Sequence, residues 1–142
     1  MKSLSVKFGV VFIGLVIFGC AEVWGADWKS CGSTDSYFCF YDTQSLTRPS
    51  KNIVRVWVRW MYTEKGRLDE QRALAKDGYL KSVDYSEILH ELDCSERKYR
   101  VLSLNYYDFS GGSIAEFARS SSTWEFINPE SMIEILYKEV CK

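Results

Sequence analysis

The strongest pattern in this chain is the strict alternation of residues 53–62, IVRVWVRWMY. One side of an extended strand there is wholly apolar and the other side is mixed, as in a strand with one buried face. The apolar side consists of Val54, Val56, Val58, Trp60 and Tyr62, and the mixed side of Ile53, Arg55, Trp57, Arg59 and Met61. Because β-branched residues lose side-chain freedom in a helix, this segment is predicted to be a strand.

Other segments along the chain have the same extended character. A tight turn at residues 95–97 separates two of them, which predicts an antiparallel hairpin. Residues 47–52, TRPSKN, are polar and contain a proline, so they are predicted to be a loop. Strand-like sequence begins soon after Trp28, and strands are predicted at residues 35–41, 85–94, 98–108, 114–120 and 124–127.

Two segments carry helical signals. Residues 68–80 are rich in strong helix formers, with Asp69 placed to cap a short helix that ends near Gly78. At the C-terminus, Asn128 is expected to cap a helix that has Pro129 at its first position. The apolar stripe of this second helix consists of Ile133, Leu136, Tyr137 and Val140.

These elements together predict an α+β fold. Aromatic residues make up 15% of the chain, which favours strands over a helical bundle. We expect a single antiparallel sheet of about four to six strands, packed against the C-terminal helix and accompanied by a short additional helix.

The N-terminus has the pattern of an export signal. Lys2 and Lys7 precede an apolar and glycine run at residues 8–19, which is shorter than the about 20 residues that a spanning helix needs. We interpret residues 1–25 as a signal peptide cleaved after Gly25, leaving a single domain at 26–142. In the alternative interpretation, residues 17–20 form a lipobox and Cys20 is acylated, although Phe18 is bulky for that motif. Both interpretations place the protein in the periplasm or at the outer-membrane surface of a bacterium. Only acylation of Cys20 would attach it to the membrane, through a lipid anchor.

The cysteine count agrees with export. Once Cys20 is removed or acylated, an even number of cysteines remains, which in an exported chain indicates two disulfides. Three pairings are open by count alone. Cys94 is in phase with the apolar residues of its strand and Cys141 lies on the apolar stripe of the last helix, so we favour a Cys94–Cys141 bridge. Cys31 and Cys39 then pair with each other.

The residue types offer little for catalysis. His90 is the only histidine, and it is in phase with apolar neighbours, so we interpret it as a packed, hydrogen-bonded residue and not as a catalytic base. Glu87, Glu91 and Asp93 alternate along the same strand and are interpreted as a solvated face. We expect no catalytic residue, no metal and no cofactor. The balance of 18 basic and 19 acidic residues argues against a nucleic-acid partner.

Arg55, Trp57 and Arg59 are the candidate partner-binding residues. They follow one another on the mixed side of the 53–62 strand, where arginines and a tryptophan could form a cation–π surface for a partner. In the other interpretation, a helix covers Trp57 and the arginines reach solvent or pair with Glu87 and Glu91. We favour this second interpretation.

A series of short motifs runs in order along nearly the whole mature chain. They are Trp28, Tyr41-Asp42, residues 45–48 (SLTR), 52–57 (NIVRVW), Asp93-Cys94, 99–103 (YRVLS), Tyr106-Tyr107, 124–129 (WEFINP) and Val140-Cys141. With these motifs, the chain resembles the surface-adhesin protein E family of bacterial exported proteins. The resemblance implies an antiparallel sheet packed on a helix and a Cys94–Cys141 bridge. Cys31 and Cys39 lie outside the usual pattern of the family.

The resemblance also implies a function. It indicates an exported, non-enzymatic protein that binds a protein or other macromolecule at the cell envelope. Adhesion to host matrix proteins is associated with the type member, but a shared fold does not by itself transfer that activity. The alternative function is a periplasmic inhibitor of a cell-wall-degrading enzyme such as lysozyme. An inhibitor would use a protruding loop, whereas an adhesin would use a broad face.

Overall fold

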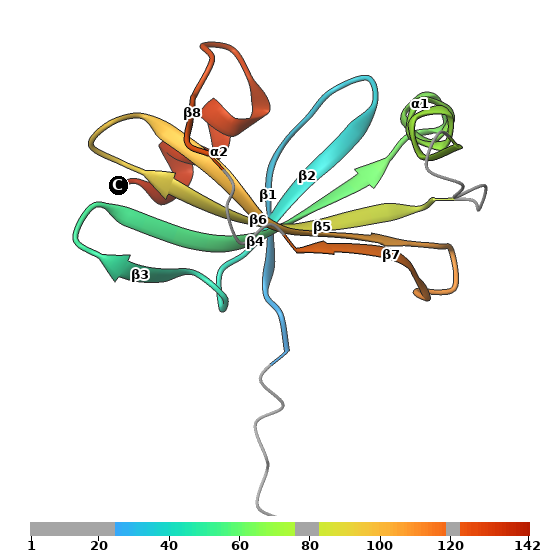
Figure 1. The fold of residues 1–142 in the computed structure, drawn as a ribbon, viewed down its shortest axis with the longest axis horizontal. Helices are drawn as coiled ribbons and strands as arrows, with labels where there is room; N and C mark the ends of the chain where they lie inside the picture. Colours follow the sequence, from blue (N-terminus) through green and yellow to red (C-terminus); the bar gives the residue numbers. More distant parts are fainter. Residues whose placement is uncertain (1–24, 76–82, 119–122) are drawn as a thin grey trace, which may run out of the picture.

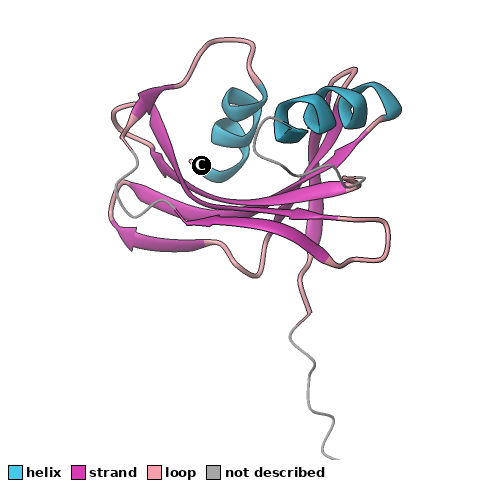
Figure 2. Ribbon diagram, turned by 45° about the vertical axis from the view of Figure 1, so that its right-hand side comes forward, coloured by secondary structure: helices cyan, strands magenta, loops and turns pink. Residues whose placement is uncertain are grey.

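The computed structural model describes residues 25–75, 83–118 and 123–142. They build one curved, antiparallel sheet with both helices on the same side (Figure 1, Figure 2). The order across the sheet is β1-β2-β4-β5-β6-β7, with β3 paired to β4 and β8 paired to β6. The elements are β1 (Trp28–Ser33), β2 (Tyr37–Asp42), β3 (Thr47–Ser50), β4 (Ile53–Tyr62), α1 (Glu64–Ala75), β5 (Tyr85–Asp93), β6 (Lys98–Tyr107), β7 (Ser113–Ala118), β8 (Glu125–Phe126) and α2 (Met132–Val140).

Some of the expected features lie outside the described residues. Most of the signal peptide and Cys20 fall in residues 1–24, and the expected helix end near Gly78 falls in residues 76–82. No helix in the described part of the chain is long and apolar enough to cross a membrane.

Strand β4 has the predicted bounds and the predicted alternation. Its side chains at Val54, Val56 and Val58 are fully buried on the side of the helices. They pack in one cluster with Leu92 of β5 and with Leu136 of α2, among others. Burying apolar side chains of this kind stabilises a fold by about 1.5–3 kcal/mol each, so the helix side of β4 is the centre of the core.

The described residues form a sheet of eight strands, which is more than the four to six expected. Residues 47–52 were predicted to be a loop, but Thr47–Ser50 forms the edge strand β3, which pairs with the first residues of β4. Pro49 has no N–H to donate, which a strand tolerates at the edge of a sheet. Strand β1 had no predicted bounds either. It pairs with β2 in the register Trp28↔Asp42.

Helix α2 begins later than predicted. The cap is Ser131, whose side chain accepts the N–H of Glu134 at 3.2 Å, and the first helical residue is Met132. Asn128 and Pro129 belong to the preceding turn. Glu130 has φ of 62°, a left-handed conformation that interrupts any helix started at Pro129. The apolar stripe is shifted accordingly, and its buried members are Met132, Leu136 and Val140.

Helix α1 begins earlier than predicted, directly after β4. Thr63 caps it, because the Thr63 Oγ1 accepts the N–H of Gly66 at 3.2 Å. Asp69 is therefore not the cap. It lies in the middle of the helix and pairs with Arg72 at 3.6 Å on the surface.

Both disulfides have the partners favoured from the sequence. Cys94 is bonded to Cys141 and thereby joins the end of β5 to the end of α2. The Tyr137 hydroxyl donates a hydrogen bond to the Cys94 carbonyl at 2.7 Å, which reinforces the same junction. Cys31 is bonded to Cys39 and joins the neighbouring strands β1 and β2.

We expect the two disulfides to stabilise the fold unequally. Cys94 and Cys141 are 47 residues apart, whereas Cys31 and Cys39 are 8 apart. Longer closed loops remove more entropy from the unfolded chain, so the double variant Cys94→Ala/Cys141→Ala should lose about 1.5 kcal/mol more than Cys31→Ala/Cys39→Ala. Urea unfolding of both variants measures the difference, and equal losses would contradict the expectation.

Gly66 in the first turn of α1 packs against the β1–β2 turn. A Cβ at this position would lie 1.8 Å from the Ser36 carbonyl oxygen. Alanine normally favours a helix over glycine by about 1 kcal/mol. Here we expect Gly66→Ala to lower the free energy of unfolding by about 1–3 kcal/mol, because the helix or the turn must move. The control is Lys65→Ala at an exposed position of the same turn, which should change stability by about 0.5 kcal/mol or less.

Candidate functional site

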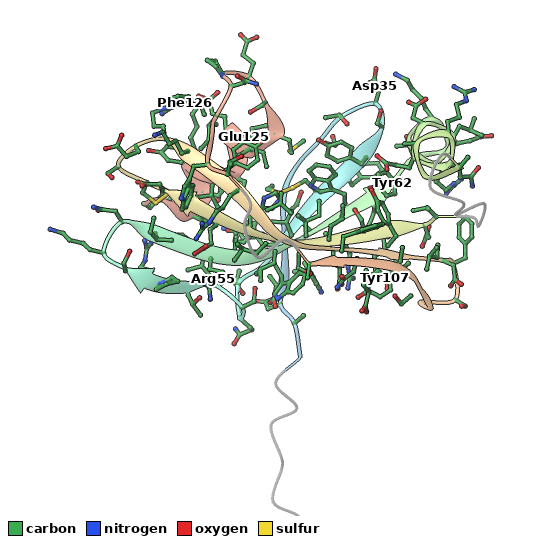
Figure 3. All side chains as sticks on the ribbon, viewed as in Figure 1. Asp35, Arg55, Tyr62, Tyr107, Glu125 and Phe126 are labelled. Atoms are coloured by element: carbon green, nitrogen blue, oxygen red, sulfur yellow. A yellow bond between two sulfur atoms is a disulfide. The ribbon has the colours of Figure 1, made fainter. Side chains whose placement is uncertain are left out.

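The side of the sheet opposite the helices carries charged and aromatic residues in rows across the strands. We call this side the open face, because both helices lie on the other side (Figure 2). Figure 3 shows Arg55 and Tyr107 on the open face and Tyr62 on the helix side. Cross-strand register gives three adjacent rows across β4, β5 and β6: Arg59, Glu87 and Asn105; Trp57, Leu89 and Ser103; and Arg55, Glu91 and Arg100.

Arg59 is enclosed by its neighbours on the open face. Its Nε donates a hydrogen bond to the Glu87 Oε1 at 3.1 Å. The guanidinium carbon lies 4.2 Å from the ring centroid of Trp28 and 4.8 Å from that of Tyr85. Tyr85 in turn stacks on Tyr107 at 4.7 Å. These cation–π and stacking contacts hold the Arg59 guanidinium in one place.

Glu91 is the most deeply placed charge of the open face. Its side chain is 4% exposed, and arginines from both neighbouring strands share its carboxylate. Arg55 Nη2 donates to Oε2 at 3.2 Å, and Arg100 donates to Oε1 from Nε at 3.0 Å and from Nη2 at 2.7 Å. A buried carboxylate requires such partners, since an unpaired one is strongly destabilising. The interpretation of the acidic residues of this strand as a solvated face is therefore wrong for Glu91.

Trp57 lies in the uncharged row between the two arginines of β4. Its side chain is partly exposed, and both helices lie on the other side of the sheet. The favoured interpretation was therefore wrong in expecting a helix over Trp57. The second part of that interpretation is confirmed, because Arg55 pairs with Glu91 and Arg59 pairs with Glu87.

Sequence reasoning missed several residues that complete the open face. Trp28 and Tyr85 cover Arg59, and the Trp124 ring lies 4.5 Å from the guanidinium of Arg100. The predicted turn at 95–97 would have set Glu91 opposite Val101, so it did not predict the contact with Arg100. The turn occupies residues 94–97, which sets Glu91 opposite Arg100. No local pattern places Trp28 or Trp124 there, since each comes from a distant segment.

His90 lies on the helix side of β5, opposite Val56 and Val101. It is 2% exposed, which agrees with the predicted packed position. The predicted hydrogen bond is not found, because neither ring nitrogen has a partner among the described residues. Burial lowers the pKa of His90 to about 4, so the ring is neutral near pH 7.

The described residues contain no group of three or more His, Cys, Asp or Glu side chains that could hold a metal ion. The carboxylates of Glu87 and Glu91 are each engaged by arginine, which keeps them as ion-pair partners. The arrangement of the open face is thus suited to recognition through aromatic rings and guanidinium groups.

The comparison with protein families agrees with this architecture. A family model described as surface-adhesin protein E matches residues 28–142, which include every strand and both helices. The chain belongs to the surface-adhesin protein E family. The three rows of the open face all lie within the part of the chain that matches this family.

A solved structure of protein E has a similar fold. Protein E from non-typeable Haemophilus influenzae is 13% identical with a TM-score of 0.50, and the similarity covers 80% of this chain and 74% of that one. Crystal form II of Haemophilus influenzae protein E is 13% identical with a TM-score of 0.47, covering 72% of this chain and 79% of that one. A search of curated proteins finds no match. At such identity, the first of these structures shows the fold of the surface-adhesin protein E family and not the partner.

We expect His90 to make the stability of this surface-adhesin protein E family member depend on pH. Its pKa is about 4 in the fold and about 6.5 in an unfolded chain. The unfolded state therefore binds more protons between these values, and stability falls as the pH is lowered from about 6.5 towards 4, by up to about 3 kcal/mol. Urea unfolding followed by tryptophan fluorescence across this range measures the loss.

The matched control is His90→Phe, which keeps an aromatic ring in the core and removes the titratable group. Carboxylates also contribute to acid sensitivity, so the informative quantity is the difference between the two pH profiles. The profile of His90→Phe should be flatter between pH 6.5 and 4. Identical profiles would show that His90 does not cause the dependence.

Proposed function

We propose that this member of the surface-adhesin protein E family is an exported, non-enzymatic protein that binds a macromolecular partner through the open face. The observation that carries the proposal is the partly exposed Trp57, held between two ion-paired arginines on the central strand. Trp, Tyr and Arg are the residue types that dominate binding energy at protein interfaces. A strand at the centre of a sheet presents them already ordered, which reduces the entropy cost of binding.

Export is part of the same proposal. The apolar run after Lys2 and Lys7 supports a signal peptide at residues 1–25, and two disulfides suit an oxidising compartment. We place the protein in the periplasm or at the outer-membrane surface, with acylation of Cys20 as the alternative to cleavage after Gly25. Intact mass spectrometry of the exported protein distinguishes a chain that begins at Ala26 from one that begins at a lipid-bearing Cys20.

The breadth of the candidate surface favours an adhesin over a periplasmic inhibitor of lysozyme. The candidate residues extend across three neighbouring strands, whereas an inhibitor that enters a catalytic cleft would concentrate them on one loop. Inhibition of lysozyme turnover by the exported protein would favour the inhibitor instead.

The proposal makes Trp57 the first residue to test. We expect Trp57→Ala to weaken binding of the partner by about 2 kcal/mol or more and to leave the melting temperature nearly unchanged, because the side chain is on the open face and not in the core. Binding is measured by surface plasmon resonance on the immobilised protein, against a panel of host extracellular matrix proteins. A loss of stability of about 3–5 kcal/mol would instead identify Trp57 as a core residue and contradict its role in binding.

Trp60 provides the matched control on the other side of the same strand. Its ring stacks on Tyr37 at 4.5 Å within the packed side of the sheet. Trp60→Ala should therefore lower the melting temperature clearly, whereas it changes no residue of the open face. If Trp60→Ala weakens binding more than Trp57→Ala at a temperature where both variants are folded, the open face is not the binding surface.

A further inference from the structure

The two arginine groups of the open face differ in charge balance. Arg59 forms an ion pair with one carboxylate, that of Glu87, and no second arginine pairs with that carboxylate among the described residues. Arg55 and Arg100 share the single carboxylate of Glu91. The first group is therefore neutral, whereas the second has one positive charge in excess.

The two groups also differ in how their guanidiniums are occupied. The Arg59 guanidinium lies between the rings of Trp28 and Tyr85, and two of its nitrogens donate to Glu87. Its side chain is only 28% exposed. Arg59 is therefore mainly a structural residue that joins β1, β4 and β5.

Arg55 and Arg100 keep donors that none of the described residues accepts. Arg55 uses one nitrogen for Glu91, its buried Nε has no partner among the described residues, and its side chain is 42% exposed. Arg100 donates twice to one oxygen of Glu91, lies against the Trp124 ring and is 31% exposed. A guanidinium has five N–H donors, so each of these two arginines can donate hydrogen bonds to a further anionic partner.

We propose that the Arg55–Glu91–Arg100 cluster is an anion site that receives a carboxylate side chain of an acidic protein partner. The inference rests on the proposed function, because it gives the chemistry of the partner that the open face binds. An incoming carboxylate would neutralise the excess charge and accept hydrogen bonds from the terminal guanidinium N–H groups that Glu91 does not use, since Arg55 Nε is buried. The guanidinium fork matches a carboxylate in shape, and the buried Glu91 keeps both forks in position before the partner arrives.

The surroundings of the cluster favour a protein over a polyanion such as a sulfated glycan or a nucleic acid. Polyanions bind to surfaces with a marked excess of basic residues. The cluster has a single excess charge, and in the neighbouring row Asp93 is opposite Lys98, so that row adds no net charge. The adjacent uncharged row contains Trp57, and Trp124 borders the cluster. An isolated carboxylate within a partly apolar partner surface fits this composition best.

The anion site can be measured directly with acetate as the probe. The guanidinium N–H signals of the exported, fully oxidised protein are followed by NMR during titration with sodium acetate, with chloride lowered to keep the ionic strength constant. We expect the signals of Arg55 and Arg100 to shift in a saturable way, while that of Arg59 stays in place as the internal control. A response of Arg59 equal to theirs, or no response at Arg55 and Arg100, overturns the proposal.

The choice of an acidic protein is tested with three ligands. A peptide that carries one glutamate among apolar residues, heparin and single-stranded DNA are compared for binding to the same protein. We expect the peptide to bind more tightly than either polyanion, and Arg55→Gln to weaken peptide binding by about tenfold or more. The control is Arg72→Gln, which removes the same charge from a 78% exposed side chain on α1 and should change peptide binding less than about twofold. Tighter binding of heparin or DNA, or equal effects of the two variants, overturns the proposal.

These experiments separate the inference from the proposed function. The acetate titration needs no partner, so its failure removes the anion site and leaves the open face as the proposed binding surface. Partner binding that is insensitive to Trp57→Ala removes the open face as the binding surface and, with it, the assignment of the anion site to a partner.

Discussion

The pleat of strand β4 constrains both sides of the sheet. This strand pairs with β2 and β3 along one edge and with β5 along the other. Its register therefore decides which side chains of these neighbours point to each side of the sheet. Its three fully buried valines fix one side against α2. Because side chains alternate with a period of two, Arg55, Trp57 and Arg59 must point to the opposite side. A slip of one residue would bury two guanidiniums and expose the core, which makes the register strongly specified.

At the Arg55–Glu91–Arg100 cluster of the open face, the acid lies beneath the bases. The Glu91 carboxylate is 4% exposed, whereas the Arg55 side chain is 42% exposed and that of Arg100 is 31% exposed. This order leaves the one excess positive charge of the cluster on the outer side of Glu91. It also fixes the arginines, because neither can leave without uncovering a buried carboxylate. Members of one fold family can differ in function through such surface details while their cores stay alike, as expected when sites are built on a common fold.

The features predicted correctly from the sequence depend on local periodicity. The bounds and the two sides of β4, and the hairpin of β5 and β6, follow from alternation that any extended strand imposes on its side chains. The partners of Cys94 and Cys141 follow from the same phase argument, applied to a strand and a helix. The α+β fold and the C-terminal helix were predictable for this reason, and the similarity to the surface-adhesin protein E family rests on the same ordered motifs.

Other features depend on contacts between distant segments, and the sequence alone did not determine them. Asn128-Pro129 satisfies the local rules for a helix start as well as Ser131 does, and only the left-handed backbone at Glu130 decides between them. Residues 47–50 form a strand only because they pair with the edge of β4. Glu91 is buried because arginines of two neighbouring strands close over it. The sequence by itself determined which residues share a side of each strand, since that depends on bond geometry. Tertiary structure decided which side stayed open and which charges meet there, because these depend on how separate strands and helices pack.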